Sequence, residues 1–177
     1  MRVMLLILFV AAISFLVGCR IYSMVAFENR EFPSDVRPST ISSAIAEKYS
    51  VGDVIIQPRI IHADPAQTSY KLAILFFSKT TNETVSISSV SIFIDGNKLE
   101  YGEGLIGQVP SPWKMYSANH PFFASSVSGE PMVFPPKNGN VSRIDMKITV
   151  LIKQGGNNAT AKIIDASFVP KKKSFIE

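Results

Sequence analysis

Apolar and polar residues alternate with a period of two after Gly52, and this pattern limits the possible folds more than any other feature. In the run 85–94, Val and Ile occupy alternate positions on either side of a one-residue slip, and Ser occupies most of the others. The run 144–153 places Ile, Met and Val on one side and mostly charged or hydroxyl residues on the other. A period of two is that of a half-buried β-strand. The sequence therefore predicts antiparallel sheets with one face buried.

Turn residues and one irregularity mark the ends and the register of these strands. The alternation slips by one residue at Ser88-Ser89, where a β-bulge would fit. Asp95-Gly96-Asn97 predicts a tight hairpin, because glycine adopts positive φ without steric cost. The stretch 155–158, Gly-Gly-Asn-Asn, predicts a looser hairpin between the last two strands. Pro58 lies inside the first apolar run, so that strand is expected either at a sheet edge or broken at Gln57.

The number and spacing of the runs predict the fold class. Seven runs fit a strand: 54–63, 70–79, 85–95, 98–101, 132–134, 144–153 and 161–169. No long helical pattern separates them. We therefore expect an all-β fold, an antiparallel β-sandwich of immunoglobulin-like kind. An open barrel is the alternative.

The amino terminus differs from the rest of the chain. Residues 1–18 contain one charge, Arg2, followed by an apolar run from Val3 to Val17 that only Ser14 interrupts. At 1.5 Å per residue, this helix would span about 22 Å, less than the roughly 30 Å of a bilayer core. Its length is that of a secretory signal peptide. This run also explains the positive mean hydropathy of +0.20.

A cysteine directly follows this run. The tetrapeptide Leu16-Val17-Gly18-Cys19 resembles the lipobox of bacterial lipoproteins. The resemblance implies removal of residues 1–18, lipidation of the Cys19 thiol and acylation of the new amino terminus. Cys19 is the only cysteine, so a disulfide framework and a Cys-based zinc cluster are excluded. The alternative is an uncleaved membrane anchor in which Cys19 has no special role.

The residue that follows Cys19 indicates in which membrane the lipoprotein would be anchored. In lipoproteins of Gram-negative envelopes, Asp at this place resembles the signal for retention in the inner membrane, whereas this chain has Arg20. The resemblance therefore implies a lipid-anchored protein of the cell envelope, on the periplasmic face of the outer membrane.

Three parts of the chain are expected. Residues 1–18 are the signal peptide, 19–50 a lipidated tether, and 51–177 the β-sandwich domain. The tether is polar, and it includes one possible short helix over Ser39–Tyr49, for which Ser39 or Thr40 could provide the N-cap.

One segment of the domain, 102–130, lacks the strand pattern and is rich in proline and aromatic residues. Loops of more than about 12 to 15 residues are uncommon and usually functional or disordered. Trp and Tyr are favoured at protein interfaces. The candidate protein-binding residues are Trp113, Lys114, Tyr116, Phe122 and Phe123. The alternative is that Trp113 and Phe123 fold back and cap the core.

Catalytic and metal-binding motifs were sought and not found. His62 and His120 lie far apart, acidic residues are scattered, and no nucleophile elbow or phosphate-binding glycine loop occurs. We therefore predict no enzymatic activity, no metal and no cofactor. The net charge is +4, and Lys171-Lys172-Lys173 is interpreted as a solvated tail, with attraction to anionic head groups or an acidic protein as the alternative. Nucleic acid is not expected as a partner outside the cytoplasm.

The combination of lipobox, small sandwich and aromatic segment resembles, in architecture alone, the lipoprotein immunity factors that block toxic effectors. Examples of such effectors are the phospholipases of type VI secretion. The resemblance implies a protein partner whose active cleft is occluded, and it assigns no residues. The alternative is a structural lipoprotein of an envelope or secretion-system assembly, and a third hypothesis is an enzyme or solute-binding lipoprotein.

Overall fold

The computed structural model describes residues 21–63, 69–101, 103–117, 120–132, 141–155 and 159–176. The chain divides into two compact units. The larger is Phe27–Pro170, and the smaller combines Met1–Ala26 with Lys171–Glu177. In the smaller unit, the described residues 21–26 and 171–176 are extended strand. The signal peptide and Cys19 lie outside the described residues.

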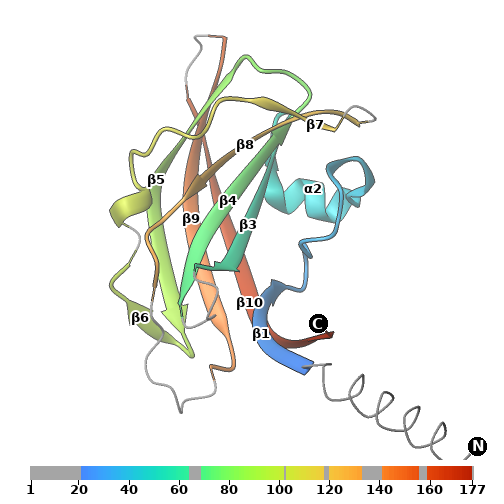
Figure 1. Ribbon diagram of the computed structural model, residues 1–177. Helices are drawn as coiled ribbons and strands as arrows, with labels where there is room; N and C mark the ends of the chain where they lie inside the picture. The colour runs from blue at the N-terminus through green and yellow to red at the C-terminus, as the bar shows by residue number, and fades with distance from the viewer. Residues whose placement is uncertain are drawn as a thin grey trace, which may run out of the picture. The chain divides into compact units, whose positions relative to one another are not determined.

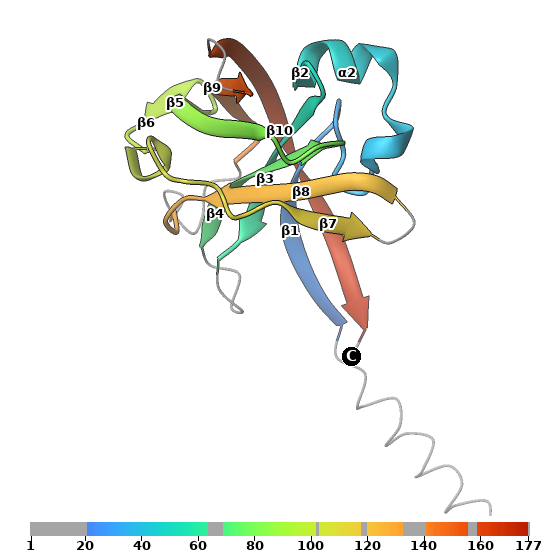
Figure 2. The ribbon, with the colours of Figure 1, turned by 90° about the horizontal axis from the view of Figure 1, so that it is seen from above.

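The described strands form two antiparallel sheets of five strands each (Figures 1 and 2). The first, called the β9 sheet, has the order β1 (Ile21–Asn29), β10 (Thr160–Ile176), β9 (Ile144–Gln154), β5 (Glu83–Ile94) and β6 (Asn97–Leu99). The second, called the β4 sheet, has the order β2 (Ser50–Val51), β3 (Val54–His62), β4 (Tyr70–Ser78), β8 (His120–Ser128) and β7 (Lys114–Ser117). The helices are η1 (Pro38–Thr40), α2 (Ser43–Tyr49) and η2 (Glu103–Leu105).

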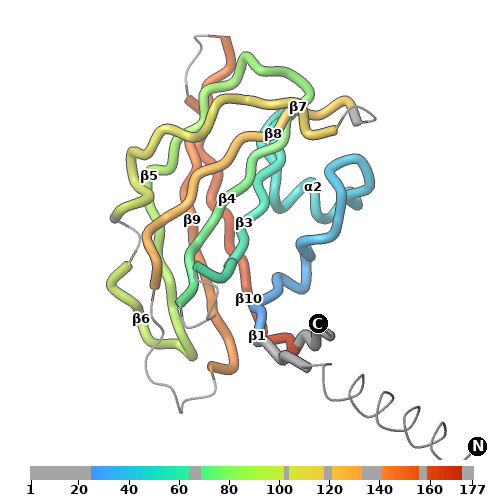
Figure 3. The backbone as a smooth tube through the Cα atoms, in the orientation of Figure 1, coloured from blue at the N-terminus to red at the C-terminus, as the bar shows by residue number. Residues whose placement is uncertain are grey.

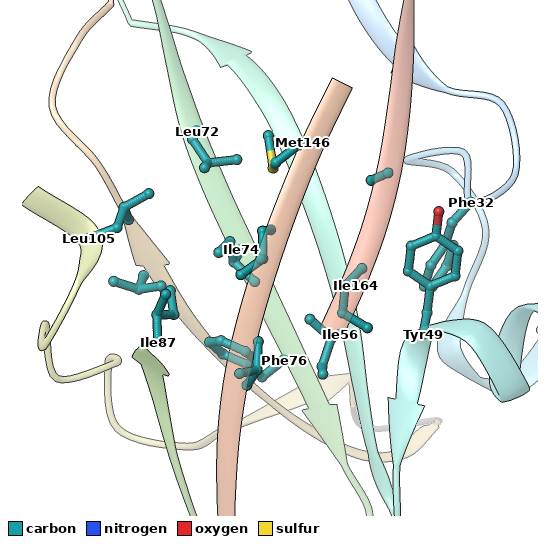
Figure 4. Packing of buried hydrophobic residues seen from close by; sticks show 14 of the residues in the cluster. Phe32, Tyr49, Ile56, Leu72, Ile74, Phe76, Ile87, Leu105, Met146 and Ile164 are labelled. Carbon is teal, nitrogen blue, oxygen red and sulfur yellow. The ribbon is translucent and has the colours of Figure 1, made fainter. Parts of the chain in front are cut away.

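The core of the larger unit lies between the two sheets, as Figure 4 shows. The β4 sheet contributes Ile56, Leu72, Ile74 and Phe76, and the β9 sheet contributes Ile87, Met146 and Ile164. Each of these side chains is at most 2% exposed. They are the alternate residues of their strands, which is the pattern that the sequence predicts. The prediction of an all-β antiparallel sandwich is therefore confirmed.

Two local predictions are also confirmed. The register of β5 against β9 shifts between Ile87 and Ser89, at the predicted bulge. Asp95 and Gly96 form the loop between β5 and β6 with φ of 48° and 85°. Positive φ at both central positions matches the twist of a two-residue hairpin. Pro58 lies where β3 is a sheet edge, because β2 pairs only with Val54 and Ile55.

The prediction of a long loop over 102–130 is wrong, and the predicted number of strands is too low. This segment contains η2 and two strands, β7 and β8, and residues 123–128 of β8 pair with the central strand β4. Ser125 and Ser126 are adjacent on β8, so its polar and apolar residues do not alternate with a period of two. Met132 forms only an isolated bridge with Tyr70. The other two residues of the predicted strand 132–134 lie outside the described residues.

The segment predicted as a tether is largely folded into the larger unit. Phe27, Phe32 and Tyr49 are 7%, 1% and 0% exposed. The expected helix exists, but α2 begins at Ser43 and its N-cap is Ser42, whose hydroxyl accepts a hydrogen bond from the Ile45 N–H. The aromatic side chains explain the difference, because burial of large apolar surfaces holds the segment against the sheets.

Asp95 lies in the loop between β5 and β6. Its carboxylate makes the stability of this end of the β9 sheet dependent on pH. The Ser142 hydroxyl, with the backbone N–H groups of Arg143 and Ser142, holds the pKa of Asp95 below its usual value of 3.8. Because the folded-state pKa is the lower one, the stabilisation is complete above the unfolded-state pKa and is lost as pH falls through the folded-state pKa.

We expect Asp95→Asn to lower the melting temperature at neutral pH and to have a smaller effect at about pH 3. Thermal melting of both proteins over this pH range measures the difference. A constant difference at every pH would contradict the role of the ionised carboxylate.

Candidate functional site

Three of the five predicted binding residues lie partly or fully within the fold. Phe122 is 7% exposed and belongs to the core, and Phe123 is half-buried. Trp113 packs against the core, and its indole Nε1–H donates a hydrogen bond to the Glu83 carbonyl oxygen over 3.0 Å. The alternative of core packing, which was given for Trp113 and Phe123, therefore describes Trp113, and Phe122, predicted to bind a partner, is buried in the core.

The other two predicted residues, Lys114 and Tyr116, are exposed on β7. This strand borders β8 at the edge of the β4 sheet (Figure 3). Between them lies Met115, which the sequence analysis missed and which is 65% exposed. Tyr116 is 42% exposed, and its ring packs edge-on against Phe77 with 5.1 Å between centroids. We call Lys114, Met115 and Tyr116 the β7 edge.

Exposed apolar side chains are concentrated in the segment of sequence that leads into β7 and includes it. Four of the seven large hydrophobic residues exposed in the described chain lie between positions 106 and 116. They are Ile106, Val109, Met115 and Tyr116, and Val109 is 89% exposed. Single exposed apolar residues are normal, but their concentration in one segment of a small domain is typical of an interaction surface.

Sheet register places an arginine on the same face of the β4 sheet as Lys114. Lys114 pairs with Ala124, Ala124 with Phe77, and Phe77 with Ile55, so these four side chains share a face. Arg59 lies four residues beyond Ile55 on β3 and therefore also shares it. We call this the outer face of the β4 sheet, since Ile56 and Phe76 point to the opposite, core side.

The Arg59 guanidinium is held by neutral acceptors. Its Nε donates to Gln57 Oε1 over 3.0 Å, and its Nη2 donates to the same oxygen over 2.6 Å and to the Ser34 carbonyl over 2.8 Å. Burial lowers the pKa of Arg59, an effect that electrostatic interaction with Tyr116 opposes. An arginine remains protonated in spite of such a shift. The outer face thus contains a half-buried positive charge on β3, which β4 and β8 separate from β7.

Arg59 was not predicted, but the sequence contains a signal for it. Gln57 and Arg59 are polar residues at alternate positions of an otherwise apolar run. One face of β3 was therefore expected to be polar, and the structure shows that this face is largely covered. Gln57 is 0% exposed.

A second candidate is a hollow of about 480 Å³ in the larger unit. It is lined by residues of β6, η2 and the end of β8, among them Leu99, Tyr101, Leu105 and Glu130. The Tyr101 hydroxyl donates a hydrogen bond to the Glu130 carbonyl oxygen. Burial raises the pKa of Tyr101, so its hydroxyl remains neutral near pH 7. This arrangement lacks a base and a nucleophile in contact, and we assign no chemistry to it.

No group of three His, Cys, Asp or Glu residues that could hold a metal ion occurs among the described residues. The His62 ring stacks on the Tyr70 ring with 4.8 Å between centroids. None of the described helices has the length and apolarity needed to cross a membrane.

Comparison of the chain with protein-family models, curated proteins and solved structures finds no significant match.

Proposed function

We propose that this chain is a lipid-anchored protein of the bacterial cell envelope that binds another protein through its β7 edge and has no catalytic activity. The main supporting observation is the exposure of Met115 and Tyr116 on an edge strand. The lipobox-like residues at positions 16–19 support the anchor.

An edge strand with exposed apolar side chains has the properties of a binding surface. β7 is the last strand of its sheet, so one side of its backbone has no neighbouring strand among the described elements. Such an edge can pair with an extended segment of a partner. Met and Tyr are enriched in protein interfaces because they bury large areas. Burial of these side chains against a partner removes apolar surface from water.

In its specific form, the proposed partner is a toxic secreted effector, and the protein is its immunity-type inhibitor. Binding at the β7 edge would cover the effector's active cleft, and the lipid would hold the inhibitor at the membrane under attack. A small rigid sandwich suits this task, because its interface residues lose little freedom on binding. Protection of cells that produce both proteins tests this form directly.

Two substitutions test the binding surface. The full chain would capture its partner from the source cells, and the affinity of the purified pair would then be measured. We expect Met115→Asp and Tyr116→Ala each to weaken binding by about 30-fold or more, as for interface hot spots. Both side chains are exposed, so folding should be preserved.

The matched control is Ile163→Asp. Ile163 is an exposed hydrophobic residue, 53% accessible, on β10 of the other sheet. We expect this variant to bind the partner like the unmodified chain. Equal affinity of all three variants would show that the β7 edge is not the interface.

A further inference from the structure

Arg59 has positive charge without a negative partner. It takes no part in the ion pairs of the described residues, which include Lys48–Glu31, Lys98–Glu100 and Arg143–Asp145. Burial of a charge is costly when neutral groups alone replace its hydration. The environment of Arg59 therefore favours the binding of an anion at the outer face.

We propose that Arg59 is the centre of a carboxylate-recognition site, and that its occupant is an Asp or Glu side chain of the protein partner bound at the β7 edge. This inference rests on the proposed function and names the chemistry of the partner.

The hydrogen bonds of the guanidinium leave its Nη1 group available. A guanidinium has five N–H donors. Gln57 and Ser34 accept hydrogen bonds from Nε and Nη2, and no acceptor for Nη1 occurs among the described residues. The two remaining N–H groups can donate to a carboxylate oxygen. Such charge-assisted bonds are about twice as strong as those between neutral groups.

The site is held in place before a ligand arrives. Gln57 is fully buried, and its Nε2 donates to the Pro33 carbonyl oxygen over 2.9 Å. This bond fixes the amide oxygen that accepts two hydrogen bonds from Arg59. Because the acceptor and the Ser34 carbonyl are both positioned by the fold, the guanidinium loses little freedom when it binds.

The surroundings favour a protein side chain over a lipid surface. Arg59 is half-buried, so a flat layer of head groups reaches it poorly, whereas a side chain that projects from a partner can reach it. Tyr116 interacts electrostatically with Arg59, and Ile61, two residues further on the same face, is 38% exposed. Lys114 adds a second, exposed positive charge. An acidic residue within an apolar contact surface complements this combination.

Nitrogen-15 NMR of the full chain in a non-ionic detergent tests the site without a known partner. The probe is N-acetyl-glutamate amide, and the neutral probe N-acetyl-glutamine amide is its isosteric control. We expect saturable shifts of the Arg59 Nε–H signal with the first probe alone, and much smaller shifts for Arg37 and Arg143. The absence of a saturable Arg59 response, or equal responses of all three arginines, would overturn the proposal.

Two further titrations separate the possible anions. Inorganic phosphate and vesicles of phosphatidylglycerol would be added in place of the glutamate probe. A response to phosphate or to vesicles, without one to the glutamate probe, would overturn the assignment of a carboxylate. A response to the glutamate probe that vesicles do not reproduce would support it.

Variants connect the site to the partner. We expect Arg59→Gln and Arg59→Lys to reduce affinity for the captured partner by at least about 10-fold, since truncating one member of a hydrogen-bonded charge pair has large effects. Lys147→Gln removes one exposed charge from the other sheet and should leave affinity unchanged. Melting curves of each variant show whether the fold is retained.

The two proposals can fail separately. If the β7-edge variants weaken binding while both Arg59 variants bind normally, the carboxylate site is wrong and the binding surface stands. If neither set of variants changes the affinity, the binding surface itself is wrong.

Discussion

Replacement of Tyr49 by alanine is expected to lower the free energy of unfolding of the larger unit by about 3 to 5 kcal/mol, the usual loss for a large buried aromatic residue. Tyr49 is 0% exposed, and its ring packs edge-on against Phe32 with 5.4 Å between centroids (Figure 4). Alanine would leave a cavity that the surrounding side chains fill only in part.

The Tyr49 hydroxyl adds a polar contribution. It accepts a hydrogen bond from Asn29 Nδ2 over 3.1 Å and lies 2.9 Å from Glu31 Oε2, to which it donates. Burial raises the pKa of Tyr49, so the hydroxyl keeps its proton. We expect Tyr49→Phe to cost about 1 to 3 kcal/mol, because Asn29, which is 3% exposed, loses its acceptor.

The control is Lys48→Ala, which removes the exposed ion pair with Glu31 and is expected to cost less than about 1 kcal/mol. Urea unfolding followed by the fluorescence of the single tryptophan, Trp113, measures all three variants. If Tyr49→Ala costs no more than Lys48→Ala, residues 27–50 contribute little to the folded unit, as a tether would.

The strands that could be predicted are those whose apolar residues recur with a period of two and whose turns are marked by glycine. β5 is an example, since both its bulge and its hairpin were visible in the sequence. β8 could not be predicted, because Pro121 and three serines obscure its alternation. The residues of β8 and β4 that pair are 45 to 55 positions apart in the sequence (Ser78 with Phe123, Ala73 with Ser128). Such non-local pairing overrides local propensity.

The candidate site was predictable only in part, for a related reason. The exposed residues Lys114 and Tyr116 were identified from composition, because charged and aromatic residues stand together near prolines. The role of Arg59 in the candidate site could not be predicted, because its environment depends on contacts between distant segments. Its half-burial follows from Gln57, Ser34 and the edge position of β3, and no pattern within one strand indicates that the chain near residue 34 lies over it.

The proposed lipid anchor predicts the other large effect. In Cys19→Ser, incorporation of labelled palmitate should disappear, and the protein should no longer remain with the outer-membrane fraction. A thioether-linked diacylglycerol requires a thiol, which serine lacks. Each buried methylene contributes about 0.8 kcal/mol, so several acyl chains together give a stable attachment that a single chain does not.

The matched control is Ser14→Ala, which changes the apolar run but leaves residues 16–19 intact. It should incorporate palmitate and remain anchored. The mass of the mature wild-type protein provides an independent readout, since cleavage before Cys19 removes the mass of residues 1–18 and lipidation of Cys19 adds the mass of the lipid. An unmodified protein that keeps its first 18 residues and takes up no palmitate would contradict the lipoprotein hypothesis. In that case the apolar run itself is the attachment, and the β7 edge would have to meet its partner from an uncleaved amino-terminal anchor.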